Sequence, residues 1–184
     1  MILYIHGFRS TENSVKAVQL KAYYKEQIHI ASFSHVPNQA IHTLEQIIKS
    51  HDIHGIMASS LGGFYATFLS EKYDIKTALI NPSTRPYETL ERYLGENETH
   101  DGVLFDWKRM YLEQLRQFAV TKPRAKNYAV FLKAGDDILD HHVAAEYYQG
   151  AQVFIDEGGT HRFDDFEKHL EKVDHFFGLS HVKL

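Results

Sequence analysis

Short apolar runs without polar interruptions constrain the fold of this chain more than any other feature of its sequence. The run at residues 2–5 is apolar at every position and ends at His6-Gly7, as expected of a strand that is buried on both faces. Six segments are predicted to be strands: 2–5, 28–33, 55–58, 76–80, 128–132 and 152–155. Segments with helical spacing separate most of them. The sequence therefore predicts an α/β fold with a mainly parallel sheet of about six strands and helices on both faces.

The segment between the fourth and fifth predicted strands interrupts this alternation. It shows two helical patterns, at about 86–95 and 104–119, without a strand signal between them. We therefore expect a small helical cap inserted at about residues 85–126. The 184 residues of the chain match the size of one domain, so a single domain is predicted over residues 1–184.

The charge and composition of the chain exclude several classes of protein. A net charge of −4 does not favour binding to nucleic acid, and the absence of cysteine excludes disulfides, thiolate metal sites and cysteine nucleophiles. No apolar stretch approaches the ~18 residues that a membrane span needs, and the first residues do not resemble a signal peptide. A cytoplasmic protein without a membrane span is expected. The sequence carries no signal for an oligomeric state.

The turn that follows the predicted strand at 55–58 contains the candidate nucleophile. A strand that turns directly into a helix exposes its turn residue, and it requires small residues two positions before and after that residue. Ala58 and Gly62 meet this requirement around Ser60, whereas bulky residues flank the competing Ser59. The sequence therefore predicts Ser60 as the nucleophile. A turn of this kind, taken alone, also suits a phosphate group.

The order of three residues along the chain strengthens this interpretation. Ser60, Asp136 and His161 follow one another as the nucleophile, acid and base of α/β-hydrolases do, and the last two each follow a predicted strand. His161 would take the serine proton, and Asp136 would hold the imidazole in one tautomer. Three other carboxylates remain alternatives for the acid: Asp137, Asp140 and Asp156.

The turn His6-Gly7-Phe8, after the first predicted strand, supplies the remaining part of such a site. The backbone N–H of Phe8 is expected to join that of Leu61 in an oxyanion hole. Each donor of this kind lowers the barrier by roughly 2.7–4 kcal/mol. This chemistry needs no cofactor and no metal.

These segments resemble the YqiA-type family of small bacterial esterases in the α/β-hydrolase superfamily. The resemblance covers essentially the whole chain and rests on residues 3–8, 58–67, 81–87, 135–140 and 159–163. It implies the α/β-hydrolase fold and a serine carboxylesterase or thioesterase. It also implies short acyl esters as substrates, with fatty acyl-CoA thioesters as a further substrate class.

Two residues depart from the pattern of that family. Ala58 replaces the usual glycine, a change that the strand-to-helix turn at Ser60 (the nucleophile elbow) tolerates. Arg9 follows Phe8 in place of a small polar residue. We expect Arg9 to alter the acyl or leaving-group pocket. Trp107 and other aromatic residues of the cap are candidates to line an acyl slot, although helix packing explains them equally well.

The second half of the predicted cap is basic. Residues 108–126 contain six basic side chains and one acidic side chain. Such a run is commonly the solvated face of a helix. If it borders the pocket, Lys122 and Arg124 would attract an anionic leaving group such as the phosphates of coenzyme A.

Other functions compete with ester hydrolysis. Amide or peptide hydrolysis would use the same three residues, and a non-catalytic ligand-binding protein would keep the fold. A nucleotide site is disfavoured because the turn lacks the lysine of a P-loop. His141 and His142 suggest a metal site, but adjacent side chains on a helix point in different directions, so no metal site is predicted.

Overall fold

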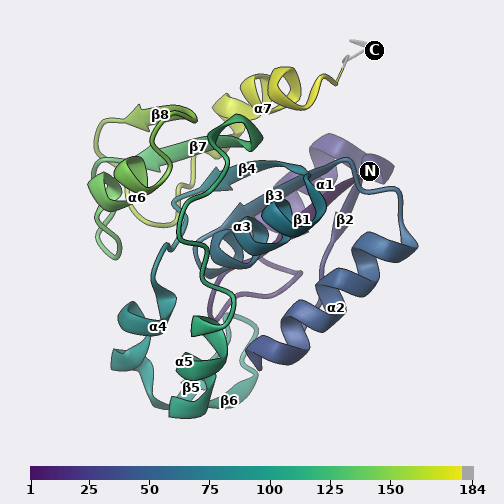
Figure 1. Cartoon of the computed structure of the whole chain (residues 1–184). Coiled ribbons are helices and arrows are strands. Elements are labelled where there is room, and N and C mark those ends of the chain that lie inside the picture. The colour runs from purple at the N-terminus through teal and green to yellow at the C-terminus, as the bar shows by residue number, and fades with distance from the viewer. Residues whose placement is uncertain (180–184) are drawn as a thin grey trace.

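The computed structural model describes residues 1–179, and it contains the six-stranded sheet that the apolar runs predict (Figure 1). All neighbouring strands of this sheet are parallel, and their order is β2-β1-β3-β4-β7-β8. The strands are β1 (Ile2–Ile5), β2 (Ile28–Ile30), β3 (Gly55–Ser59), β4 (Lys76–Ile80), β7 (Tyr128–Lys133) and β8 (Gln152–Asp156). The end of the predicted domain, with His181, lies outside the described residues.

Helices cover both faces of the sheet, which confirms the predicted fold class. One face packs against α2 (Pro37–Ser50), α3 (Leu61–Tyr73), α5 (Arg109–Arg116) and α6 (His141–Tyr147). The other face packs against α1 (Val15–Tyr24) and α7 (Leu170–Phe177). Short 3₁₀ helices occupy Lys25–Gln27, Glu91–Tyr93, Ala125–Asn127 and Phe166–His169. Within residues 1–179, no helix combines the length and the apolar character that crossing a bilayer requires.

Alternation along the strands explains why both faces of the sheet are covered. In β1, Leu3 and Ile5 join the core on the α3 face, while Ile2 and Tyr4 join the core on the α1 face. In β7, Val130 joins the core on the α3 face and Phe131 joins the core on the α1 face. Because successive side chains point to opposite faces, a strand that is apolar at every position needs cover on both sides.

The predicted helical cap is wrong in its secondary structure. The segment between β4 and β7 contains α4 (Pro86–Thr89), α5, and an antiparallel pair of strands, β5 (Gly95–Glu98) and β6 (Leu104–Trp107). These elements lie together at the lower edge of Figure 1. The hairpin turns through Gly102, whose φ of 84° favours glycine, and Phe105 and Trp107 are its inward side chains. Two apolar residues at a spacing of two are too short a pattern to distinguish a strand from a helix.

A cluster of charged side chains surrounds the end of β7 and supports the chain after β8. Lys133 is buried, and its Nζ lies 3.0 Å from an oxygen of Asp156 and 2.7 Å from an oxygen of Asp165. Lys168 contacts the same two carboxylates, and Nε2 of His169 lies 2.9 Å from Asp156. We call these five residues the Lys133 cluster.

The two carboxylates of the Lys133 cluster favour their ionised forms. Burial alone would raise the pKa of Asp156, but hydrogen bonds from His169 and the two lysines outweigh it and hold that pKa well below its ordinary value. Hydrogen bonds from Lys133 and Lys168 lower the pKa of Asp165 to about 2. Both groups therefore stabilise the fold above the pKa of an unfolded aspartate, and this stabilisation is lost as the pH falls through the folded pKa.

The Lys133 cluster predicts a loss of stability in acid. As the pH falls from about 5 to about 2, protonation of Asp156 and Asp165 is expected to lower the free energy of unfolding by on the order of 1–2 kcal/mol. This figure includes solvent screening of the exposed carboxylate. Urea unfolding across this range should show a shallower pH dependence for Lys133→Met than for the unsubstituted protein. Lys122→Met, at an exposed lysine, is the control and should keep the original slope. An equally steep slope for Lys133→Met would contradict the prediction.

Candidate active site

Ser60 lies at the sharp turn between β3 and α3. Its φ of 53° and ψ of −123° belong to a strained conformation that side chains rarely adopt. Backbone hydrogen bonds hold it on both sides, because its N–H donates to the Ile80 carbonyl at 3.1 Å and its own carbonyl accepts from the Ser83 N–H at 3.0 Å. The neighbouring strand β4 and the loop after it therefore impose the conformation of Ser60.

Close approach of the backbone explains the small residues around Ser60. A Cβ atom added at Gly62 would lie 2.5 Å from the His6 carbonyl oxygen and still closer to that of Ile5. At Gly7, an added Cβ would lie 3.0 Å from the Ser60 Cβ. The turn after β1 and the start of α3 can therefore meet only where both backbones lack a side chain.

Gly62→Ala is expected to destabilise the protein by about 3 kcal/mol. The added methyl group meets backbone atoms of β1, so α3 has to move away from the sheet. Gly55→Ala is the matched control, since its added methyl group would meet the Phe177 ring at 3.0 Å and a ring can shift. Urea unfolding measures both variants. Equal losses of stability at the two positions would contradict the argument.

Ser60, His161 and Asp136 form a continuous chain of hydrogen bonds. The Nε2 of His161 lies 2.9 Å from the Ser60 Oγ, and its Nδ1 lies 2.7 Å from Oδ2 of Asp136. The side chain of Asp136 is 3 % exposed and that of His161 is 18 % exposed. The other oxygen of Asp136 accepts the N–H groups of Ile138 and Leu139 at 2.8 and 2.9 Å, which fixes the orientation of the carboxylate.

The three alternative carboxylates have other partners. Asp137 accepts the backbone N–H of His161 at 3.1 Å, and Asp140 accepts the N–H of His142 at the start of α6. Asp156 belongs to the Lys133 cluster. Among the sequence candidates, the geometry therefore pairs Asp136 with the imidazole of His161.

Asn81 is a buried residue of this site to which sequence reasoning assigned no role. Its amide nitrogen donates to the carbonyl of His161 at 3.1 Å, and its oxygen accepts the N–H of Lys133 at 2.9 Å. The φ of Asn81 is 41°, a conformation that asparagine tolerates better than most residues. Its position immediately after β4, next to the elbow, is the signal that could have identified it.

Phe8 follows β1, Leu61 follows Ser60 at the start of α3, and both residues line the same cavity. Leu61 is the first residue of α3, so its N–H has no partner within the helix. The ring of Phe8 is held by aromatic residues of the inserted segment, with ring centroids 5.0 Å from Trp107 and 5.4 Å from Tyr93. These contacts anchor the turn that carries the Phe8 N–H.

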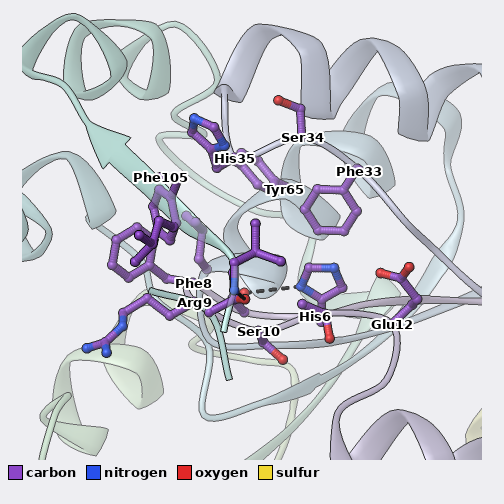
Figure 2. A pocket seen from close by; sticks show the side chains of 16 residues that line it. His6, Phe8, Arg9, Ser10, Glu12, Phe33, Ser34, His35, Tyr65 and Phe105 are labelled. Carbon is purple, nitrogen blue, oxygen red and sulfur yellow. Dashed lines mark hydrogen bonds between the residues drawn. The ribbon is translucent and has the colours of Figure 1, made fainter. Parts of the chain in front are cut away.

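Two cavities adjoin the turn at Gly7 and Phe8, and both are lined in part by these two residues. The polar cavity has a volume of about 400 Å³, and its lining includes Lys16, Gln19, Ser60, His161 and Arg162. The apolar cavity has a volume of about 260 Å³ and is shown in Figure 2, and its lining includes His6, Phe33, Leu61, Tyr65, Leu104 and Phe105.

Arg9 is one of the residues that line the apolar cavity. Its Nε donates to the carbonyl of Glu98 at 2.9 Å, and its own carbonyl accepts the N–H of His100 at 3.0 Å. Arg9 therefore joins the turn after β1 to the hairpin of β5 and β6. Figure 2 shows its side chain directed away from His6 and Phe33.

Trp107 and Arg124, which were candidates to contact the substrate, do not line either of the two cavities. Trp107 is 1 % exposed and packs against Phe8 and Tyr111, so its ring is part of the core and not the wall of a slot. Arg124 pairs with Glu71 and Asp74 at distances of 2.7 and 3.0 Å. These acids lie at the end of α3 opposite Ser60, and the 13 residues of α3 span roughly 20 Å.

Lys122 lies in the same stretch, between α5 and the 3₁₀ helix that precedes β7. The carbonyl of nearby Val120 accepts the hydroxyl of Tyr147, which is the last residue of α6. This stretch thus follows the amino edge of the sheet, whereas Ser60 lies at the carboxyl edge. The condition under which Lys122 and Arg124 would attract an anionic leaving group is therefore not met, because chain topology separates these two residues from Ser60.

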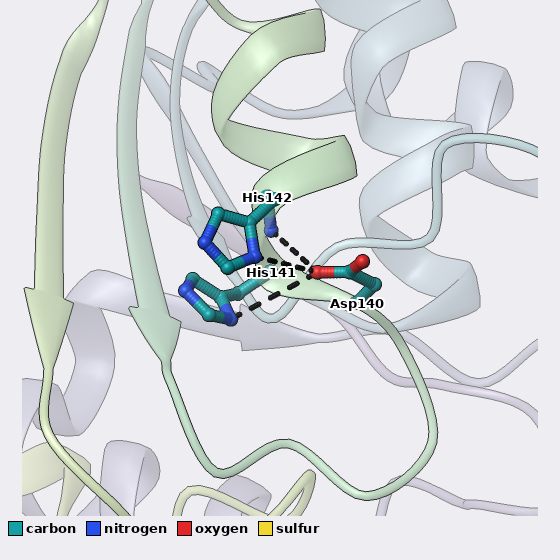
Figure 3. Close-up of side chains that lie close together, drawn as sticks. All are labelled: Asp140, His141 and His142. Atoms are coloured by element: carbon teal, nitrogen blue, oxygen red, sulfur yellow. Dashed lines mark hydrogen bonds and ion pairs between the residues drawn. The ribbon is translucent and has the colours of Figure 1, made fainter.

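One cluster among residues 1–179 brings together three side chains of the kind that bind metals: Asp140, His141 and His142 (Figure 3). The expectation that adjacent side chains diverge is wrong here, since the two imidazole rings lie 3.9 Å apart and both face Asp140. These residues begin α6, where Oδ1 of Asp140 already accepts the N–H of His142 and lies 3.0 Å from its Nδ1. The carboxylate thus acts as a helix cap at an exposed position.

Comparison with known proteins places the chain in a family. A model described as "Uncharacterised protein family (UPF0227)" matches residues 1–178. A UPF0227 protein of Pectobacterium atrosepticum and the UPF0227 protein YcfP of Salmonella gallinarum are each 28% identical, over 96% of this chain and 98% of the relative.

Solved structures show the same fold at low sequence identity. Alpha/beta hydrolase domain-containing protein 10 from mouse superposes with a TM-score of 0.76 at 13% identity, over 96% of this chain and 89% of that chain. Est1E from Butyrivibrio proteoclasticus superposes with a TM-score of 0.67 at 18% identity, over 96% of this chain and 84% of that chain. The expected α/β-hydrolase fold is confirmed, and the chain belongs to the UPF0227 family, of the YcfP and YqiA type.

Proposed function

We propose that this protein is a serine hydrolase that cleaves carboxylic esters through an acyl-enzyme. The observation that carries the proposal is the chain of hydrogen bonds from Ser60 through His161 to Asp136, at distances of 2.9 and 2.7 Å. Nothing in ligand binding alone requires a strained serine hydrogen-bonded to an imidazole that a buried carboxylate orients.

Acylation would begin when the Ser60 Oγ attacks the ester carbonyl carbon. Nε2 of His161 takes the hydroxyl proton, and the carbonyl oxygen becomes an oxyanion that accepts the N–H groups of Phe8 and Leu61. Asp136 stabilises the resulting imidazolium without taking its proton. The carbon–oxygen bond to the alcohol then breaks, and His161 donates the proton to the departing alkoxide.

Deacylation would repeat these steps with water in place of the serine. Nε2 of His161 removes a proton from water as the water oxygen attacks the acyl carbonyl. The tetrahedral intermediate collapses, the bond to the Ser60 Oγ breaks, and the imidazolium returns its proton to Oγ. The products are the carboxylic acid, the alcohol and the regenerated enzyme.

The proposal names esters and does not extend to coenzyme A thioesters. Lys122 and Arg124, which suggested an anionic leaving group, lie away from Ser60, with Arg124 paired to Glu71 and Asp74. Esterases are among the structural neighbours, including an esterase domain from Rhodothermus marinus. A panel of matched esters and amides separates esterase from amidase activity.

A fluorophosphonate probe tests the proposed nucleophile directly. We expect a mass increase corresponding to one covalently bound probe on the intact protein and on Ser59→Ala, and none on Ser60→Ala. Ser59 is the matched control because it is the adjacent serine and lies at the end of β3. Failure of the probe to label the folded protein would contradict the proposal and favour the non-catalytic binding protein.

A further inference from the structure

The two cavities beside the candidate active site differ in chemistry. Most of the exposed surface of the apolar cavity is apolar, although Arg9, Glu12 and four serine or threonine residues also line it. The polar cavity is lined by Asn13, Lys16, Gln19, His100, Arg162 and other polar groups. The turn at Gly7 and Phe8, which carries one of the proposed oxyanion donors, belongs to both linings. A substrate carbonyl held at this turn would therefore adjoin both cavities.

The position of His161 determines which part of an ester enters which cavity. The group that leaves has to accept a proton from Nε2 of His161, so it must lie on the side of that ring. His161 and Ser60 line the polar cavity and not the apolar cavity. Phe8 and Leu61, which carry the proposed oxyanion donors, both line the apolar cavity, whereas a third cavity shared by Ser60 and Leu61 holds only about 30 Å³. The apolar cavity is therefore the space beside the oxyanion donors that can hold an acyl substituent.

The wall of the apolar cavity is suited to a small uncharged group. His6 stacks on Phe33 with ring centroids 4.3 Å apart and an interplanar angle of 12°, and His35 lies 4.9 Å from Phe105. In Figure 2, the rings of His6, Phe33, Tyr65 and Phe105 surround the same space. Burial lowers the pKa of His6, which favours its neutral form near pH 7.

The volumes of the cavities limit the size of the two groups. The apolar cavity of about 260 Å³ lies below the ~300–1,000 Å³ that is typical of sites for drug-sized ligands. It therefore suits an aromatic ring or a short chain better than a long fatty chain. The polar cavity of about 400 Å³ offers hydrogen-bonding groups of both charges, including Lys16, Asp101 and Asp164.

We propose that the apolar cavity is the acyl subsite, selective for short aliphatic or single-ring aromatic acyl groups, and that the polar cavity binds a hydroxyl-bearing alcohol as the leaving group. This inference rests on the proposed esterase function and deepens it by naming the substrate class. Phe105 and Leu104 restrict the acyl group, and Gln19 restricts the alcohol. None of the three takes part in proton transfer or carries an oxyanion donor. The ring of Phe105 does contact that of Phe8, at 5.7 Å between centroids, so its variant is compared only through ratios within one substrate series.

A crossed specificity experiment tests the assignment. The acyl series consists of p-nitrophenyl acetate, butanoate, benzoate and octanoate, and the alcohol series consists of methyl acetate and glyceryl monoacetate. Phe105→Ala enlarges the apolar cavity, and Leu104→Trp narrows its mouth at a side chain that is 72 % exposed and contributes little to packing. Gln19→Trp fills part of the polar cavity. Values of kcat/KM are compared only as ratios within each series.

Each variant is expected to change one ratio only. Phe105→Ala should raise the octanoate-to-acetate ratio of kcat/KM about 10-fold. Leu104→Trp should lower the benzoate-to-acetate ratio by a similar factor. Gaining or losing a methylene-sized contact in an apolar pocket changes kcat/KM by about this much. Gln19→Trp should lower the glyceryl-to-methyl ratio about 10-fold. In each case, the ratio in the other series should stay within about twofold. Leu104→Trp, at an exposed position, tests the apolar cavity even if Phe105→Ala does not fold.

Three results would overturn the assignment. An effect of Gln19→Trp on the acyl series, with effects of Phe105→Ala and Leu104→Trp on the alcohol series, would mean that the two subsites are reversed. Unchanged ratios in every folded variant would mean that neither cavity contacts the substrate. In both of these cases, fluorophosphonate labelling of Ser60 persists, so the esterase proposal survives. Absence of both labelling and hydrolysis removes the esterase proposal and the subsites together.

Discussion

Ser60→Ala is expected to lower kcat for a good ester substrate by a factor of roughly 10⁴–10⁶, with little change in the thermal unfolding midpoint. The substitution removes the atom that would form the acyl-enzyme, and His161 then has no hydroxyl proton to take. The oxyanion donors and the cavities remain, so a small residual rate above that of water is expected. Steady-state kinetics with p-nitrophenyl acetate measures the loss.

Ser59→Ala distinguishes the role of Ser60 from that of a neighbouring serine. The Ser59 Oγ lies 3.0 Å from the hydroxyl of buried Tyr4, so its loss removes one hydrogen bond worth about 1 kcal/mol of stability. We expect kcat to fall less than about threefold. A variant of Ser60 that retains more than a tenth of the activity would remove the acyl-enzyme mechanism.

Asp136→Asn is expected to lower kcat by about 10⁴-fold while the fold is preserved. The amide oxygen can still accept the N–H groups of Ile138 and Leu139, as Oδ1 does at 2.8 and 2.9 Å. The amide nitrogen, however, would stand 2.7 Å from Nδ1 of His161 and present a second donor there. The imidazole then favours the tautomer in which Nε2 carries the proton, and it can no longer take one from Ser60.

Asp137→Asn is the matched control for Asp136→Asn. Its carboxylate accepts the backbone N–H of His161 and does not contact the ring in the described hydrogen bonds, so an amide oxygen can replace it. We expect kcat to fall by no more than about 10-fold, since the position of His161 is only loosened. Reversal of the two effects would reassign the acid to Asp137.

Parallel strands explain why widely separated residues of the site could be selected from the sequence. Ser60 follows β3, Asp136 follows β7 and His161 follows β8, and these strands belong to one parallel sheet. The carboxyl ends of parallel strands lie at one edge, so residues just beyond each strand are brought together whatever their separation along the chain. Recognising the strands was therefore enough to gather these three residues.

The inserted segment between β4 and β7 could not be predicted in the same way. Phe105 and Trp107 both read as members of an amphipathic helix, but β5 and β6 pair, and Trp107 turns inward against Phe8. The charge composition of the segment likewise does not show which part of the molecule a basic side chain faces. Arg124 is basic at any position in space, and only the packing of its loop beside the end of α3 pairs it with Glu71 and Asp74.

The sequence by itself determined the α/β architecture, because strands that are apolar at every position require a sheet covered on both faces, and small residues at 58 and 62 require a tight turn between them. Tertiary structure alone decided which carboxylate pairs with His161, the role of Asn81, and the division of the space beside Gly7 and Phe8 into an apolar and a polar cavity. The physical reason is that periodicity records only whether a side chain is buried. The partner of a buried polar group depends on contacts between segments that are distant in the chain, and those contacts exist only once the segments have packed.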